Sequence, residues 1–240
     1  MPGKETSGKL YLIPTIISDD TQTLVLPPGL LQTLPRINHF LVENVRTARR
    51  FLSSLKVYPS IEPLQFEVLD KETPDAAVRE LFTPIFNGND MGVLSESGCP
   101  GIADPGALAV SFAHAHGITV VPLVGPSSIL LALMASGLNG QRFAFHGYLP
   151  VQEGALVSAL RDLERESSKR NQTQIFIETP YRNNRLMAAM VKALRPDTEL
   201  CVALDLTGPG ENIRTARVSK WKAERVDFPK LPSVFLFLAK

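Results

Sequence analysis

The sequence lacks several features that would place it in a specialised class of protein. It has two cysteines in 240 residues, Cys99 and Cys201, and no CxxC pair. It has no run of about 18 apolar residues, the length that a membrane-spanning helix needs. Its polar first residues, "MPGKETSGK", do not contain the apolar segment of a secretory signal. We therefore expect a reduced, cytoplasmic protein.

A marked excess of charge of one sign is also missing. The chain has 25 Lys and Arg against 24 Asp and Glu, which gives a formal net charge of +1. A global attraction to nucleic acid or membrane is therefore not expected, although these totals are compatible with a local basic patch. The hydrophobic fraction of 44% is ordinary for a globular protein.

The motifs of several common sites are absent as well. The sequence contains no GxxxxGK[ST] phosphate loop and no GxSxG nucleophile elbow. Its four histidines form no HExxH and have no cysteine partners at zinc spacing, so we expect no metal site. The stretch "GPGENI" from Gly208 resembles a dinucleotide-binding loop in part, but a strand-like run follows it. We therefore interpret it as a hairpin turn.

What is present is a regular alternation of strands and helices. Short β-branched runs predict strands that begin at Lys9, His39, Met91 and Ile118. Helix-spaced segments lie between them and begin at Arg46, Pro74 and Pro105. This rhythm predicts a mostly parallel sheet with helices on both faces.

The pattern changes after Leu123. The nearly all-apolar segment "VGPSSILLALMASGL" predicts a buried helix, and charge-rich helices are expected at 153–169 and 182–194. The late runs "NIRTARVSKW" and "SVFLFLA" predict strands without a helix between them, which favours antiparallel pairing in a mixed sheet. We therefore predict an α/β fold of two α/β domains, residues 1–124 and 125–240, with the boundary in a Pro- and Gly-rich cluster.

One connection between a predicted strand and a predicted helix contains more glycine and proline than the start of a helix requires. The stretch "VLSESGCPGIADPG", residues 93–106, contains three glycines and two prolines. We expect Asp104 to cap the helix that follows, and Thr73 and Thr179 to cap theirs, because each precedes a proline. A cap needs only one residue. The glycines therefore favour close approach of a ligand to the main chain at this sheet edge, with a strained turn as the alternative.

The order of several segments resembles the tetrapyrrole-methylase superfamily of S-adenosylmethionine-dependent methyltransferases. These segments are "LYLIPT", "ENVRTARRFL", "LSESGCPGIADPG", "VVPLVGPSS", "SGLNGQRFAFHGYLP", "IFIETPYRNN" and "LTGPGENIRT". Within the superfamily, the sequence is most similar to the branch that methylates a ribose 2′-hydroxyl of small-subunit ribosomal RNA. The resemblance implies a cofactor in the cleft between the two domains, and a homodimer.

The resemblance also implies which residues hold S-adenosylmethionine. The loop 96–102 would line the methionine end of the cofactor with main-chain groups, and second-domain residues would contact the rest. The implied residues are Ser95, Glu96, Ser97, Gly98, Ile102, Ser127, Ser128, Ala203, Leu204 and Pro232. A sulfonium compound with a zwitterionic tail needs backbone donors and acceptors more than charged side chains.

Transfer to a hydroxyl also requires a group that takes the proton. The candidates are three carboxylates at predicted strand ends, Glu43, Glu178 and Asp19, and the sequence does not choose between them. Glu178 could instead stabilise the N-terminus of the helix that follows it, because a carboxylate there interacts favourably with the helix dipole. Candidates for RNA phosphate contacts are Arg46, Arg49, Arg50 and Arg182, unless they belong to solvated helix faces.

Several segments depart from the family pattern. "PTIISDDTQTL" replaces a glycine-containing turn, "ENVR" replaces "EDTR", and "KLPS" replaces a KGE-like element. "FEVLDKE", residues 66–72, stands where the RNA-methylating branch has a His-rich stretch. The cofactor loop therefore matches better than the substrate face. RNA is the first expectation for the acceptor, and a small tetrapyrrole-like acceptor or a cofactor-binding protein without turnover are the alternatives.

Overall fold

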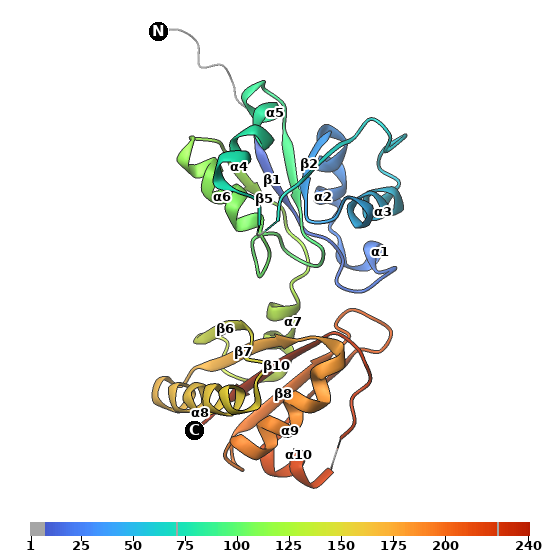
Figure 1. Ribbon diagram of the computed structural model, residues 1–240. Helices are drawn as coiled ribbons and strands as arrows, with labels where there is room; N and C mark the ends of the chain where they lie inside the picture. Colours follow the sequence, from blue (N-terminus) through green and yellow to red (C-terminus); the bar gives the residue numbers. More distant parts are fainter. Residues whose placement is uncertain (1–7, 71, 225) are drawn as a thin grey trace. The chain divides into compact units, whose positions relative to one another are not determined.

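The chain divides into two compact units, Met1–Ser127 and Ser128–Lys240. The computed structural model describes residues 8–70, 72–224 and 226–240 (Figure 1). The boundary that we expected after Val124 lies just before this division.

The first unit contains a parallel five-stranded sheet in the order β3-β2-β4-β1-β5. Its strands are β1 (Leu10–Ile13), β2 (His39–Val42), β3 (Gln65–Val68), β4 (Met91–Leu94) and β5 (Val120–Pro122). Strand β3 was not predicted from the sequence, and it overlaps the segment "FEVLDKE", residues 66–72. It lies at the sheet edge and its side chains are mostly exposed, so it lacks the apolar run of a central strand.

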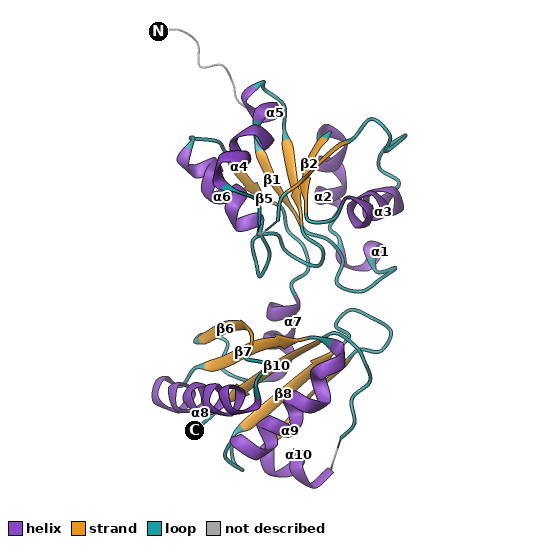
Figure 2. Ribbon diagram, in the orientation of Figure 1, coloured by secondary structure: helices purple, strands orange, loops and turns teal. Residues whose placement is uncertain are grey.

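Helices cover both faces of this sheet (Figure 2). They are α1 (Gln22–Val25), α2 (Pro28–Thr33), α3 (Val45–Leu55), α4 (Asp75–Leu81), α5 (Thr83–Phe86) and α6 (Gly106–Ala115). Alternate side chains of β2 enter different cores: Phe40 packs in the cluster with α2 and α3, and Leu41 in the cluster with α4, α5 and α6. This alternation confirms the predicted doubly covered sheet. The helix predicted from Pro74 is divided at Phe82 into α4 and α5.

The second unit contains a mixed sheet, as predicted, and its strands lie in the order β6-β7-β10-β8-β9. Its strands are β6 (Phe143–Tyr148), β7 (Thr173–Glu178), β8 (Glu199–Leu204), β9 (Asn212–Arg217) and β10 (Ser233–Leu238). Only the β6–β7 pairing is parallel among these described strands. Strands β8 and β9 form the predicted hairpin, with Gly208 in the connection.

Four α-helices are described in the second unit: α7 (Ser128–Ser136), α8 (Glu153–Arg170), α9 (Asn183–Ala193) and α10 (Val218–Glu224). The expectation that no helix lies between the last two strands was wrong, because α10 lies there. Its Val218 and Trp221 are buried three residues apart, and Trp221 Nε1 donates a hydrogen bond to the Leu200 carbonyl at 2.9 Å. The prediction that the apolar helix α7 is buried was wrong in part, because α7 is buried on one side only and its Met134 is 79% exposed.

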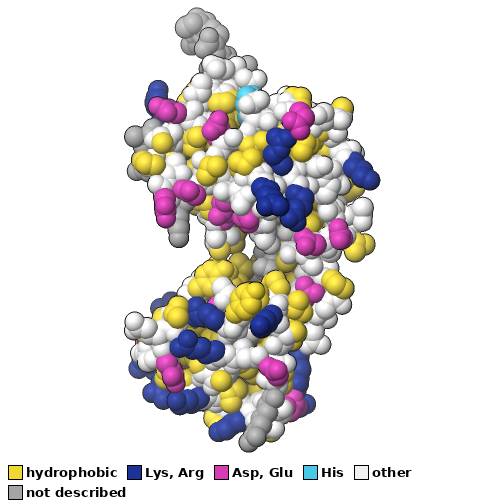
Figure 3. Space-filling model, turned by 45° about the vertical axis from the view of Figure 1, so that its right-hand side comes forward, with side chains coloured by type: hydrophobic (Ala, Val, Ile, Leu, Met, Phe, Trp, Pro, Cys, Tyr) yellow, Lys and Arg dark blue, Asp and Glu magenta, His cyan; other side chains and the backbone are white. Residues whose placement is uncertain are grey.

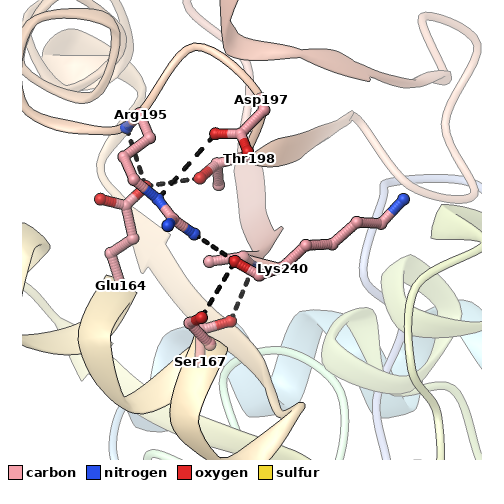
Figure 4. Close-up of polar contacts among 8 residues, drawn as sticks. Glu164, Ser167, Arg195, Asp197, Thr198 and Lys240 are labelled. Carbon is pink, nitrogen blue, oxygen red and sulfur yellow. Dashed lines mark hydrogen bonds and ion pairs between the residues drawn. The ribbon is translucent and has the colours of Figure 1, made fainter.

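A buried carboxylate ties α8 to the turn between α9 and β8. Glu164 Oε1 accepts hydrogen bonds from Thr198 Oγ1 at 2.5 Å and from the Arg195 amide at 2.8 Å (Figure 4). Ser167, one turn further along α8, accepts a hydrogen bond from the Ala239 amide at 2.9 Å. These contacts satisfy buried polar groups in the second unit.

Candidate active site

The turn that follows β4 is held in a backbone conformation that favours glycine. Gly98 and Gly101 have φ angles of +73° and +80°, and Ala103 also has a positive φ of +61°. The Gly98 carbonyl accepts hydrogen bonds from Ser95 Oγ at 2.7 Å and from the Thr15 amide at 2.9 Å. The glycines are therefore needed for the turn itself, which presents the exposed residues Glu96 and Ser97 at the carboxyl edge of the sheet.

Asp104 closes the other end of this turn. Its Oδ1 accepts hydrogen bonds from the Gly101 amide at 2.5 Å and the Gly106 amide at 2.9 Å. The second bond is to the first residue of α6, so Asp104 serves the helix start as expected and fixes the turn as well. Burial raises the pKa of Asp104, and the two backbone hydrogen bonds lower it by less. The proposed caps Thr73 and Thr179 make no side-chain bond to the amides of their helices.

The connection after β5 packs against the same turn. The Cys99 thiol donates a hydrogen bond to the Pro126 carbonyl at 3.3 Å. Gly125 leaves no room for a side chain, because a Cβ there would lie 2.2 Å from the Cβ of Pro14. Ser127 ends the first unit and Ser128 begins α7, and both are half-buried. The segments that follow β1, β4 and β5 thus pack against one another and hold each other in place.

A cavity of about 460 Å³ opens at the carboxyl ends of β1, β2 and β4. Apolar side chains such as Phe51 share its walls with polar ones. The polar lining residues are Thr15, Asp19, Asp20, Gln22, Asn44, Thr47, Arg50, Ser54, Ser95 and Glu96. The substituted segment before α1 forms part of the wall through Asp19 and Asp20, and Gln22 Nε2 of α1 donates to Ser54 Oγ at 3.0 Å.

Thr15 is a residue of this cavity that the sequence analysis missed. Its side-chain oxygen is buried and has no hydrogen-bond partner among the described residues. A threonine hydroxyl can donate one hydrogen bond and accept two. Its position two residues after the end of β1, at the edge where ligands bind in open α/β sheets, was the available signal.

Glu43 follows β2 and lies in a cluster of carboxylates. Burial raises its pKa, and the negative charges of Asp104, Glu96 and Asp70 raise it further. These carboxylates come from segments that follow three different strands, which the parallel sheet aligns. A carboxylate with a raised pKa is suited to accept a proton near neutral pH.

The three arginines of α3 have different surroundings. Arg46 is exposed and forms no ion pair with the described residues. Arg49 Nη2 lies 3.0 Å from Glu62 Oε1, and its guanidinium carbon lies 5.6 Å from the centroid of the Phe66 ring. Arg50 lines the cavity. The guanidinium of Arg49 is therefore already engaged, whereas those of Arg46 and Arg50 are accessible to a ligand.

Glu178 and Arg182, which were assigned separate roles, pair with each other in the second unit. Arg182 Nη2 lies 2.8 Å from Glu178 Oε2, and the Glu178 side chain is only 1% exposed. Glu178 Oε1 also accepts a hydrogen bond from the Thr179 amide at 2.6 Å. The pair spans the joint between a strand and a short 3-10 helix, since Glu178 ends β7 and Arg182 ends the helix, so the sequence contained no helical spacing that would have indicated it. The pair fixes the short helix Pro180–Arg182 at the end of β7.

The other implied cofactor residues of the second unit lie at the same edge of its sheet. Leu204 is opposite Ser233 across β8 and β10, and the Asp205 amide donates to the Pro232 carbonyl at 2.9 Å. The side chains of Ala203 and Leu204 are buried in apolar clusters. Strand β8 is also paired with β10 on one side and β9 on the other, so Ala203 and Leu204 expose almost none of their surface. By contrast, Ile102 of the first unit is 52% exposed.

Among the described residues, no helix is both long and apolar enough to cross a membrane. Within the same part of the chain, no group of three or more His, Cys, Asp and Glu side chains is arranged to hold a metal ion.

Comparison with known proteins identifies the relatives of this chain. Three proteins named Ribosomal RNA small subunit methyltransferase I are similar to it. The Mesorhizobium japonicum protein is 30% identical, with 90% of this chain and 69% of the relative covered. The Vibrio cholerae protein is 31% identical, covering 90% and 72%. The Bacillus subtilis protein is 31% identical, covering 91% and 70%.

Solved structures show the same fold. Uroporphyrin-III C-methyl transferase from Thermus thermophilus, complexed with S-adenosyl homocysteine, matches with a TM-score of 0.58 at 18% identity, over 96% of this chain and 97% of that one. The methyltransferase CobJ matches with a TM-score of 0.60 at 18% identity, over 97% and 95%. The model of the family described as Tetrapyrrole (Corrin/Porphyrin) Methylases matches residues 29–221. The chain therefore belongs to the tetrapyrrole methylase family of S-adenosylmethionine-dependent methyltransferases.

Proposed function

We propose that the protein transfers the methyl group of S-adenosylmethionine to a ribose 2′-hydroxyl in RNA of the small ribosomal subunit. The observation that carries the proposal is the position of Glu43, a half-buried carboxylate directly after β2 that lies near Glu96 and Asp104 of the turn after β4, where burial and these neighbours raise its pKa. Such a group can take the proton of a hydroxyl acceptor. The similarity to relatives named for small-subunit ribosomal RNA, over about nine tenths of this chain, supports RNA as the acceptor.

The cofactor contacts in this proposal come mainly from the main chain. In the first unit they are the groups of residues 95–102, where Glu96, Ser97 and Ile102 are exposed, together with Ser127. In the second unit the family resemblance implies Ser128, Ala203, Leu204 and Pro232, of which Ser128 is half-buried and Ala203 and Leu204 are almost fully buried. When bound, S-adenosylmethionine supplies an already activated methyl group. The protein's task is then to orient the acceptor and remove its proton.

We assign proton acceptance to Glu43 and a positioning role to Glu178. Using Glu178 as a base would remove the partner of Arg182, and breaking a buried ion pair costs several kcal/mol, about 3 or more. Glu43 makes no ion pair with the described residues. By the same reasoning, Arg46 is the arginine of α3 that is free to contact an RNA phosphate, with Arg50 in the cavity wall.

Methyl transfer from tritiated S-adenosylmethionine tests the acceptor. Purified protein is offered small ribosomal subunits, bare ribosomal RNA and a metabolite extract in parallel. We expect label in RNA, at the 2′-hydroxyl of one nucleotide after nuclease digestion. Label confined to the extract would identify a small acceptor such as a tetrapyrrole. Cofactor binding without label in any fraction would identify a protein without turnover, which the substituted cavity segment "IISDD" favours.

The proposal extends to assembly and location. We propose a homodimer, in line with the family resemblance, and note the exposed apolar residues Leu130 and Met134 on α7. We also propose that the enzyme works in the cytoplasm, as the sequence led us to expect.

A further inference from the structure

Charge is divided unevenly between the two units. Residues 128–240 contain sixteen Lys and Arg and eleven Asp and Glu, whereas residues 1–127 contain nine and thirteen. The formal net charges are therefore +5 and −4, although the whole chain carries +1. Figure 3 shows several Lys and Arg side chains on the visible face of the second unit. Because RNA is a polyanion, the second unit offers the better electrostatic match to it.

An exposed aromatic ring in this unit lies under a cation. Tyr181 is 81% exposed, and Lys230 Nζ lies 5.3 Å from the centroid of its ring. An aromatic ring that is open to solvent can stack on a nucleobase of any sequence. The ammonium over one face of the ring leaves the other face for a base, and it can bind the adjoining phosphate. Together the two side chains offer both contacts that single-stranded nucleic acid needs.

Both partners are held in place by buried polar contacts. Tyr181 lies in the short helix Pro180–Arg182, which the Glu178–Arg182 ion pair fixes. The segment that carries Lys230 is attached to the start of α9. Asn183 Nδ2 donates to the Leu231 carbonyl at 2.8 Å, and the Phe228 amide donates to Asn184 Oδ1 at 2.7 Å. A surface fixed in this way loses little conformational entropy when a ligand binds.

Arg185 is a second exposed cation close to Tyr181 in the sequence. It lies in the first turn of α9, which begins directly after the short helix that carries Tyr181. Among the described residues Arg185 forms no ion pair. The comparable pair of the first unit, Arg79 over Phe86, is less suitable because Phe86 also packs against Phe112 and its unit has a negative net charge.

We propose that Tyr181, Lys230 and Arg185 form a docking surface for single-stranded RNA, with a base stacked on Tyr181 and the backbone phosphates bound by Lys230 and Arg185. The proposal deepens the proposed function and rests on RNA being the acceptor. It places an RNA contact on the second unit, where the sequence analysis had named only Arg182.

Fluorescence anisotropy of a labelled single-stranded RNA oligonucleotide with the full chain tests this surface. Tyr181→Ala is expected to weaken binding about tenfold, and Tyr181→Phe to retain it, because the phenyl ring preserves stacking. Lys230→Gln is expected to weaken binding and to reduce the slope of log K against log salt by about 0.7. The matched control is Tyr148→Ala, because Tyr148 is 59% exposed in the same unit and no described cation lies over its ring.

The outcomes separate this surface from the proposed function. Binding of S-adenosylhomocysteine, measured by calorimetry, verifies that each variant is folded. If wild-type protein binds RNA and both Tyr181→Ala and Lys230→Gln bind it equally well, the docking surface is wrong and the RNA assignment stands. If wild-type protein binds S-adenosylhomocysteine but no RNA even at low salt, the RNA assignment and this surface both fail.

Discussion

At the scale of single residues, the turn after β4 depends on backbone conformations that side chains rarely adopt. Gly98 has a φ of +73°, and its carbonyl binds both Ser95 and Thr15. A β-branched residue at such a φ is a genuine outlier. The shape of the proposed cofactor loop therefore rests on this glycine more than on any charged group.

Replacement of Gly98 by valine tests that dependence. We expect Gly98→Val to abolish binding of S-adenosylhomocysteine, because the new Cβ is strained at this φ and would lie 3.3 Å from the Pro126 carbonyl. The rest of the fold should be preserved, which circular dichroism can verify. Gly117→Val is the matched control, since Gly117 has a similar φ of +68° with open space around it. Equal affinity of Gly98→Val and wild type for the ligand would move the cofactor site elsewhere.

The raised pKa of Glu43 predicts how the rate of methyl transfer depends on pH. Its raised pKa, caused by burial and by neighbouring carboxylates, means that the base is protonated in acid. Methyl transfer should therefore rise with pH through that pKa and then level off. Glu43→Gln should lower the rate about 10²- to 10⁴-fold and remove this limb of the profile, with unchanged affinity for S-adenosylhomocysteine. An unaltered pH profile in the variant would assign the proton to another group.

The same shift has a consequence for stability. A carboxyl group whose pKa is raised by folding favours the folded state when protonated, so its contribution is present in acid and is lost as the pH rises through the raised pKa. Glu43→Gln keeps the group neutral. Its free energy of unfolding should therefore exceed that of wild type at neutral pH, and the difference should disappear in acid. Urea titrations at several pH values measure this difference.

At the scale of elements, α8 is anchored through Glu164. Removing its carboxylate leaves Thr198 Oγ1 and the Arg195 amide without their acceptor. We expect Glu164→Ala to lower the free energy of unfolding by about 2–3 kcal/mol. Glu166→Ala on the same helix is the control: its ion pair with Arg170 is exposed and should be worth at most about 1 kcal/mol. Similar denaturation midpoints for the two variants would contradict the anchoring role.

Helix α3 carries two arginines with different roles: Arg49 pairs with Glu62, and Arg46 forms no ion pair with the described residues. Arg46→Ala should weaken RNA binding and leave cofactor affinity and stability unchanged, because Arg46 makes no ion pair with described residues. Arg49→Ala should mainly lower stability, since it loses Glu62 and the Phe66 ring. Binding titrations and thermal melts of both variants distinguish these effects. RNA affinity that does not respond to Arg46→Ala would remove α3 from the acceptor site.

At the scale of the whole molecule, the expected homodimer is accessible to sedimentation. The chain has a mass of 26.3 kDa, so the dimer should sediment as a species of twice that mass at micromolar concentration. The expectation comes from the family resemblance, and the exposed apolar side chains on α7 are compatible with it. A single 26.3 kDa species across the concentration range would contradict it.

The sequence alone was sufficient for the fold class and the family. Strand and helix periodicities are local properties, so they were readable in the apolar run of β4 and in the spacing of α6. Its errors were also local: β3 is polar because it is an edge strand, and the two buried residues of α10 are too few to stand out.

Only the tertiary structure decided which of the candidate residues meet. The order β3-β2-β4-β1-β5 brings Glu43, Glu96 and Asp104 into one cluster from segments far apart in the chain. It also places Arg49 on Glu62 rather than facing a ligand. Such contacts depend on how strands are ordered in a sheet, and the local pattern of a sequence does not encode that order. The candidate catalytic and binding residues were therefore visible in the sequence. Which of them form ion pairs within the protein, and which stay accessible to a ligand, was decided by the packing of the fold.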